Sequence, residues 1–160
     1  MSQQNSSSIT VRPCDYADVE KLWRKLWDER YDFKPTSSML YLSGYDGNIP
    51  KKYLPVFLSA YRETELVGVF SGHLTTSVHF RGRGLFIEDS ARGAGVGSLL
   101  ITALLQEAAL QGAKMLWATP REKSLPLFLK LGFTQDSGFT HEGFLFGPNC
   151  YVSKKLQLLL

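Results

Sequence analysis

Only two cysteines occur in the 160 residues, Cys14 and Cys150, and they are too far apart to form a CxxC pair. This excludes a disulfide framework, and two reduced thiols in the cytoplasm are the simplest interpretation. No His and Cys residues share metal-ligand spacing, so we expect no metal. No apolar run approaches membrane-spanning length, and the polar start MSQQNSSS lacks the basic and apolar regions of a signal peptide. We therefore expect a cytoplasmic protein without membrane contact, in which residues 1–8 are a disordered lead-in.

The chain also lacks a large excess of either positive or negative charge. The chain has 18 Lys and Arg against 15 Asp and Glu, and its net charge of +3 comes from basic residues scattered along the sequence. A small and scattered excess is typical of solvated faces, so we expect no nucleic-acid partner. No internal repeat or linker interrupts the chain, and its length favours one domain with its own core, over residues 9–160.

Apolar periodicity predicts the order of the elements. Residues 9–12 alternate as in a strand, and Asp15 is placed to cap a helix with an apolar stripe from Val19 to Tyr31. Residues 31–53 are irregular and aromatic, with a possible short helix at 37–41; they can form a lid over a ligand or a loop that caps the core. The other expected elements are strands at 54–61, 66–74, 74–87 and 114–118, helices from Val96 to Gly112 and at 124–131, and closing strands at 133–134 and 150–152.

The stretch from Leu85 to Gly112 carries the strongest functional signal. A short apolar run ends in an acidic turn, Glu88-Asp89-Ser90, which is followed by Arg92-Gly93-Ala94-Gly95-Val96-Gly97 and a long apolar helix. Glycines let the backbone pass close to a ligand, and the first turn of a helix directs unpaired N–H groups at it. The succession of strand, glycine turn and helix therefore predicts a binding site for a phosphate or pyrophosphate.

Two other phosphate motifs fit this turn poorly. A P-loop requires Lys after its last glycine, whereas Ser98 follows Gly97 here. A dinucleotide fingerprint requires a third glycine where Ser98 stands, and it belongs to an N-terminal parallel unit, not to a turn that follows hairpin strands. A glycine turn without a ligand is a further alternative, although packing alone favours larger side chains at the start of a buried helix.

Two motifs resemble the GNAT-type acyl-CoA N-acyltransferase superfamily. Residues 92–97 match its R/Q-x-x-G-x-G/A element, and Leu127-Phe128-Leu129-Lys130-Leu131-Gly132-Phe133 is similar to its second common element, F-Y-x-K-x-G-F. The order of the expected elements resembles that of the family as well. The resemblance covers about Ile9 to Lys155 and implies an α/β fold: a mixed, mostly antiparallel central sheet of six or seven strands, flanked by about four helices, with a splayed strand pair at the cofactor site.

This resemblance implies acetyl-CoA as the acyl donor. Backbone amides of the glycine turn would bind its pyrophosphate, the strand before the turn would lie along the pantetheine arm, and the Ile87 amide would stabilise the oxyanion. Lys123, Lys130 and Arg121 are candidates for the nucleotide phosphate, although solvated helix charges are the simpler interpretation. The cofactor-binding residues implied in this way are Leu85, Phe86, Ile87, Arg92, Gly93, Ala94, Gly95, Val96, Gly97, Ser98, Lys123 and Phe128.

The proton carriers depart from the family's pattern. The family often has a tyrosine at the position of Phe128, to protonate the departing thiolate, and a phenyl ring cannot donate that proton. A thiol with a pKa of ~8.5 is nevertheless a tolerable leaving group near neutral pH. Glu142 and Glu88 are candidate general bases, and for Glu88 capping of the acidic turn is the alternative.

We expect an N-acetyltransferase in which a deprotonated primary amine attacks acetyl-CoA directly. The acceptor would lie between residues 31–53 and 136–150, where Tyr31, Tyr45 and His141 are candidate substrate-binding residues. Carboxylates in these segments favour a small cationic molecule over a protein. Apolar residues of the long helix and the LQLLL tail allow a homodimer. The alternative is an acyl-CoA-binding sensor or interaction module with little or no turnover, which the missing tyrosine favours.

Overall fold

The computed structural model describes residues 8–26, 55–142 and 147–157. The irregular segment 31–53, its expected short helix and the candidate residues Tyr31 and Tyr45 lie outside the described residues. So do most of residues 1–8 and the end of the LQLLL tail.

The centre of the fold is a seven-stranded sheet in the order β1-β2-β3-β4-β5-β7-β6. All neighbours are antiparallel except β4 and β5, which are parallel and are connected through a helix. This confirms the expected mixed, mostly antiparallel sheet. The strands are β1 (Ile9–Pro13), β2 (Val56–Arg62), β3 (Glu65–Leu74), β4 (His79–Ile87), β5 (Met115–Ala118), β6 (Thr134–Gln135) and β7 (Val152–Lys155).

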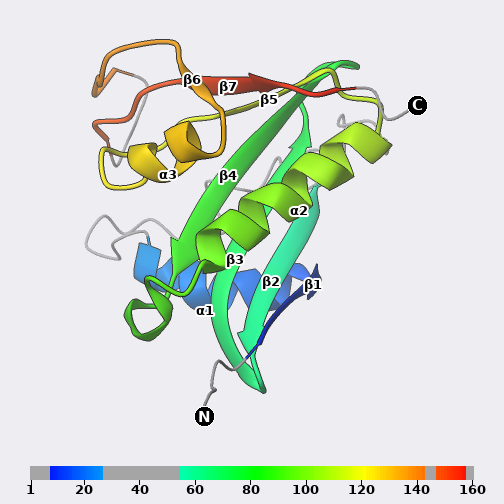
Figure 1. Cartoon of the computed structure of the whole chain (residues 1–160), viewed down its shortest axis with the longest axis vertical. Helices are drawn as coiled ribbons and strands as arrows, with labels where there is room; N and C mark the ends of the chain where they lie inside the picture. The colour runs from blue at the N-terminus through cyan, green and yellow to red at the C-terminus, as the bar shows by residue number, and fades with distance from the viewer. Residues whose placement is uncertain (1–7, 27–54, 143–146, 158–160) are drawn as a thin grey trace.

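Three α-helices and one short 3₁₀ helix accompany the sheet in the described part of the chain. They are α1 (Tyr16–Leu26), the 3₁₀ helix Asp89–Ala91, α2 (Val96–Leu110) and α3 (Leu125–Lys130). Figure 1 shows α1 and α2 on opposite faces of the sheet, with α3 beside the β6–β7 end. The two faces therefore have separate apolar contacts.

The larger core lies between α2 and the sheet. Leu100, Ile101 and Leu104 of α2 are fully buried there, together with Phe70 of β3 and Phe80 of β4. The helix ends as the sequence predicts: Gly112 has a φ of 86°, and the Ala113 amide donates to the Ala108 carbonyl in a Schellman motif. Buried apolar residues on most sides hold α2 in place, and its N-terminus lies next to the end of β4.

The smaller core lies under α1. Val19, Leu22 and Trp23 of this helix are buried against Val69 of β3, with Phe57 of β2 at the edge. These three helix residues belong to the apolar stripe that the sequence predicts, so the first helix is confirmed as far as Leu26. Because α1 contacts β2, β3 and β4, it supports the face of the sheet that α2 does not cover.

Candidate functional site

The glycine turn between β4 and α2 has an open, left-handed backbone. Gly93 and Gly95 have φ angles of 83° and 80°, and a Cβ atom built on either would meet no other atom within 4 Å. Residues 92–95 are exposed, whereas Val96 and Gly97 are buried where the helix begins. Only glycine adopts such φ angles without strain. The turn is therefore shaped by its backbone and leaves space in front of it.

The amides of this turn are available to a ligand. Within the described residues, no backbone acceptor is bonded to the N–H groups of Gly93, Gly95, Val96, Gly97 or Ser98. Gly95 is the N-cap of α2, and the first turn of the helix has no acidic side chain to occupy the positive end of the helix dipole. Unsatisfied amides at a helix N-terminus bind anions. The geometry thus supports the anion site that the sequence predicts.

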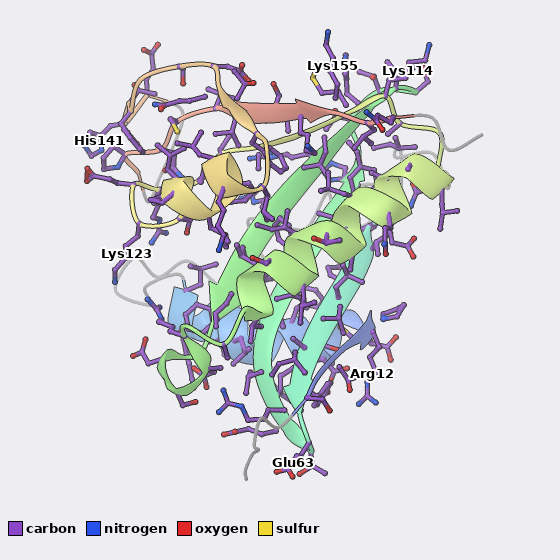
Figure 2. The ribbon with its side chains drawn as sticks, in the orientation of Figure 1. Arg12, Glu63, Lys114, Lys123, His141 and Lys155 are labelled. Carbon is purple, nitrogen blue, oxygen red and sulfur yellow. The ribbon has the colours of Figure 1, made fainter. Side chains whose placement is uncertain are left out.

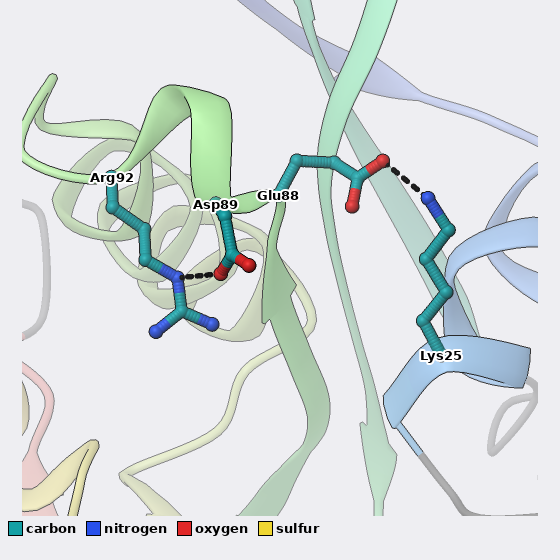
Figure 3. Close-up of polar contacts among 4 residues, drawn as sticks. All are labelled: Lys25, Glu88, Asp89 and Arg92. Atoms are coloured by element: carbon teal, nitrogen blue, oxygen red, sulfur yellow. Dashed lines mark hydrogen bonds and ion pairs between the residues drawn. The ribbon is translucent and has the colours of Figure 1, made fainter.

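Arg92 contributes to the turn through an ion pair. Its Nε lies 2.9 Å from Oδ1 of Asp89, at the start of the preceding 3₁₀ helix (Figure 3). The Asp89 carboxylate is almost fully exposed, so the pair is weak in free energy and serves mainly to order the turn. The Arg92 side chain is about half exposed.

Next to the turn, β4 separates from β5. The two strands pair only through His79, Phe80 and Arg81 of β4, so the backbone beyond Arg81 has no partner on the β5 side among the described residues. Figure 1 shows the two strands diverging from this point. The expected splayed pair is thus present, and its open edge at residues 85–87 leads directly to the glycine turn.

A β-bulge in β4 lies at this opening. Ser71 pairs with Arg83 and Val69 with Phe86, so one residue of β3 stands opposite two of β4, Gly84 and Leu85. A bulge of this kind bends its strand and changes the direction of the residues that follow. The glycine-containing stretch Arg81–Gly84 thus belongs to a continuous strand with a bulge.

Glu88 has a partner that the sequence does not reveal. Its Oε2 lies 2.6 Å from Nζ of Lys25 at the end of α1, while its amide donates to the Val67 carbonyl. Figure 3 shows the side chains of Glu88 and Asp89 pointing in opposite directions. The carboxylate does not cap the 3₁₀ helix, so the capping alternative is wrong for Glu88. The Glu88 carboxylate faces α1 and binds the Lys25 ammonium group beside the end of β4.

Phe128 is enclosed by other aromatic rings. It is 2% exposed and makes edge contacts with Phe70 and Phe133, at centroid distances of 6.5 and 5.0 Å. Leu127, the preceding residue, lies against the start of α2: a Cβ atom built on Gly97 would be 2.5 Å from Leu127 Cδ2. The second motif therefore packs α3 against the helix that carries the anion site.

The other candidate residues lie at the surface. Lys123 and His141 are exposed and point outward at the same edge of the molecule in Figure 2. Glu142 is exposed as well, and its amide N–H donates a hydrogen bond to the Thr140 hydroxyl oxygen over 3.0 Å. The described residues do not bring Glu142 into contact with Glu88, so the two candidate bases belong to different parts of the site.

A histidine is buried on β3. His73 is 5% exposed and pairs across the sheet with Arg81, while Arg83 lies two residues further along β4. Burial, and then the two guanidinium charges, lower the pKa of His73 to about 4. The imidazole is therefore neutral at pH 7. Only the pairing of β3 with β4 creates this environment, so no local pattern could show it.

The low pKa of His73 makes stability depend on pH. Unfolded His73 binds a proton below its ordinary pKa of 6.5 while the folded residue resists protonation down to about 4. Stability is thus greatest above pH 6.5 and falls between pH 6.5 and 4, by up to about 3 kcal/mol. We expect His73→Gln to flatten this fall, measured by urea unfolding at pH 7, 5.5 and 4.5. The exposed variant His141→Gln is the control, and an unchanged pH dependence in His73→Gln would contradict the assignment.

Two kinds of site are not found among the described residues. No group of three or more His, Cys, Asp or Glu there could hold a metal ion. No helix in that part of the chain is long and apolar enough to cross a membrane.

The fold is similar to those of several solved acetyltransferases. An aminoglycoside 6'-N-acetyltransferase in complex with coenzyme A superimposes with a TM-score of 0.72 at 16% identity, over 94% of this chain and 99% of that one. Ard1 from Thermoplasma volcanium gives 0.69 at 17% identity, over 93% and 98%. A GNAT-family acetyltransferase from Staphylococcus aureus Mu50 gives 0.69 at 12% identity, over 94% and 100%. The chain thus has the fold of a GNAT acetyltransferase.

The family follows from the sequence itself. The acetyltransferase (GNAT) family matches residues 19–133, more than half of the chain, and the protein belongs to this family. Members are acyl-CoA-dependent acyltransferases, in agreement with the resemblance of the glycine turn and the second motif. A comparison with curated protein sequences finds no significant match.

Proposed function

We propose that the protein is an N-acetyltransferase that transfers an acetyl group from acetyl-CoA to a primary amine. The observation that carries this proposal is the row of amides at the start of α2, without acceptors in the described residues, beside the open edge of β4. An anion site and an unpaired strand edge in continuity suit a ligand with a pyrophosphate at one end and an amide-containing arm at the other.

Acetyl-CoA would bind in a single orientation across the glycine turn and the edge of β4. Its pyrophosphate would accept hydrogen bonds from the amides of Gly93 and of residues 95–98, and its pantetheine arm would lie along residues 85–87. Lys123 is exposed and could reach the nucleotide phosphate. Phe128 would stand behind the thioester as part of the apolar wall. These roles come from the position of the residues relative to the turn and from the family.

The reaction requires few groups from the protein. A neutral amine attacks the thioester carbonyl carbon, and the Ile87 amide would stabilise the oxyanion of the tetrahedral intermediate. The intermediate collapses to an amide as the C–S bond breaks, and the nitrogen loses its proton to Glu88, Glu142 or water. The thiolate leaves without a tyrosine at position 128 to protonate it. Of the two carboxylates, Glu88 lies next to the end of β4, where it is paired with Lys25.

The acceptor is proposed to be a small cationic molecule. Of the carboxylates that favour this choice, Glu142 lies in the described residues and is exposed, with His141 beside it. Tyr31 and Tyr45 remain candidate contacts.

We place the protein in the cytoplasm, where its two free thiols, Cys14 and Cys150, stay reduced. Burial raises the pKa of Cys14 to about 11, which keeps that thiol unreactive. A homodimer is consistent with the exposed Leu99 and Leu110 of α2.

A thermal-shift titration tests donor binding directly. Acetyl-CoA at ~100 times its dissociation constant should stabilise the protein by about 2.7 kcal/mol. Release of free CoA is then followed with spermidine, an aminoglycoside, lysine and a short peptide as acceptors. We expect stabilisation by acetyl-CoA and fastest turnover with a small polycationic amine. No stabilisation by acetyl-CoA or CoA would reject the proposed function.

The second candidate function is an acyl-CoA-binding sensor or interaction module. The observation that favours it is Phe128, which stands at the position of the usual tyrosine and packs with Phe70 and Phe133 in the core. The titration and the amine panel separate the two functions. Tight binding of acetyl-CoA without turnover of any amine would favour the module.

A further inference from the structure

Trp23 connects α1 to β4, the strand proposed to bind the acyl donor, by a partly buried hydrogen bond. Its side chain is 0% exposed, and its indole Nε1–H donates to the Gly84 carbonyl over 2.7 Å. Tyr16 and Phe57 make edge contacts with its ring, at centroid distances of 5.8 and 6.2 Å. A ring held by such neighbours has little freedom to move, so the position of its N–H group is fixed.

The carbonyl that accepts this bond belongs to the bulge of β4. Gly84 has a φ of 80°, and a Cβ atom at this position would overlap the Trp23 ring. The Ser71 hydroxyl donates to the adjacent carbonyl, of Arg83, over 2.7 Å. Side chains from a helix and from a neighbouring strand thus bind successive carbonyls of the bulge. Gly84 supplies a backbone that curves toward α1, and Trp23 fills the space beside Gly84 and donates a hydrogen bond to its carbonyl.

This bulge is followed at once by the strand edge proposed to bind the donor. Residues 85–87 come after Gly84, and their register on β3 is displaced by the extra residue. On the other side, the last pair with β5 is at Arg81, so β5 does not hold them in place among the described residues. On the β3 side, Phe86 and Ile87 pair with Val69 and Gly68, so the direction of this edge depends on that pairing and on the contacts at the bulge.

We propose that Trp23 is a positioning residue for the acyl donor, which holds the edge at residues 85–87 in its binding direction through the bond to Gly84. The inference rests on the proposed function, because it assumes that acetyl-CoA binds along this edge. Trp23 does not touch the donor in this scheme. It acts through the backbone of β4, from the face of the sheet opposite α2.

The test removes the N–H group and keeps the ring. Trp23→Phe should raise the KM for acetyl-CoA and the Kd for CoA by about five- to tenfold, the range expected when one hydrogen bond to a buried carbonyl is lost. Hydrogen exchange in a peptide that contains residues 85–87 should become faster in the absence of any ligand. The apparent KM for the amine should change less than that for acetyl-CoA.

Leu22→Ala is the matched control, because Leu22 is buried in the same smaller core but its side chain cannot donate a hydrogen bond to the bulge. It should lower stability and leave both the KM for acetyl-CoA and the exchange at residues 85–87 unchanged. If Trp23→Phe does not fold, 3-benzothienyl-alanine at position 23 removes the N–H group while retaining the shape of the ring. Normal CoA affinity together with normal exchange at residues 85–87, in Trp23→Phe or in the benzothienyl-alanine variant, would overturn the proposal. Failure of the wild type to bind CoA would reject the proposed function instead, and exchange at residues 85–87 would still decide whether Trp23 orders the edge.

Discussion

Replacing Gly95 with glutamate is expected to weaken CoA binding by at least about a hundredfold, or about 2.7 kcal/mol. The space in front of Gly95 is open, since a Cβ atom there meets nothing within 4 Å, so the new side chain would project into the volume proposed for the pyrophosphate. Two like charges about 4 Å apart near a protein surface repel by about 1 to 4 kcal/mol, in addition to the steric exclusion. Isothermal titration of CoA into the variant measures the loss.

Gly112 offers a matched control on the same helix. It also has a left-handed backbone, with a φ of 86°, and a Cβ atom there also meets nothing within 4 Å, but it lies at the opposite end of α2. Glutamate at either position should cost about 1 to 2 kcal/mol of stability from backbone strain. Gly112→Glu should nevertheless bind CoA as the wild type does. Equal CoA affinity in Gly95→Glu and the wild type would refute the pyrophosphate assignment.

The glycine turn and the helix that follows it could be predicted because their sequence signals are local. Three features depend only on neighbours within a few residues. They are the N–H groups without a partner at a helix start, a glycine that permits positive φ, and the apolar periodicity of the helix. Residues 92–98 therefore indicate the proposed anion site in the sequence, and Gly112 indicates where α2 ends. The strands that flank the turn could be predicted for the same reason, with bounds that differ by one to a few residues.

The contacts that organise the rest of the site are not local. Trp23 and Gly84 are 61 residues apart, and Lys25 and Glu88 are 63 apart. Periodicity placed Trp23 on the apolar stripe of its helix, which is correct, but it could not show which carbonyl the indole reaches. Glu88 was predicted to be a base or a cap; its side chain turns toward Lys25 of α1, so it is not a cap, and its role as a base stays a prediction. Both pairs depend on how α1 crosses β4, which packing of the whole core determines.

Truncation of Phe128 to alanine is expected to destabilise the protein by about 3 to 5 kcal/mol. The ring is 2% exposed and lies between Phe70 and Phe133, so its removal leaves a cavity where α3 meets the core. Such a loss is a large part of the free energy of unfolding of a typical domain. Leu129→Ala, at a 43% exposed residue on the same helix, should change stability by less than about 1 kcal/mol. Urea unfolding of both variants at pH 7 gives the comparison.

Phe128→Tyr asks whether this position can regain the family's proton donor. Because the ring is enclosed, its hydroxyl would enter apolar surroundings and cost about 1 to 3 kcal/mol if it found no partner. We therefore expect lower stability and no rise in kcat, which would mean that the thiolate leaves without an acid from this residue. A tyrosine variant with wild-type stability and a higher kcat would show the opposite. It would mean that position 128 opens onto the thioester when the donor binds, and that this chain lacks only a hydroxyl there.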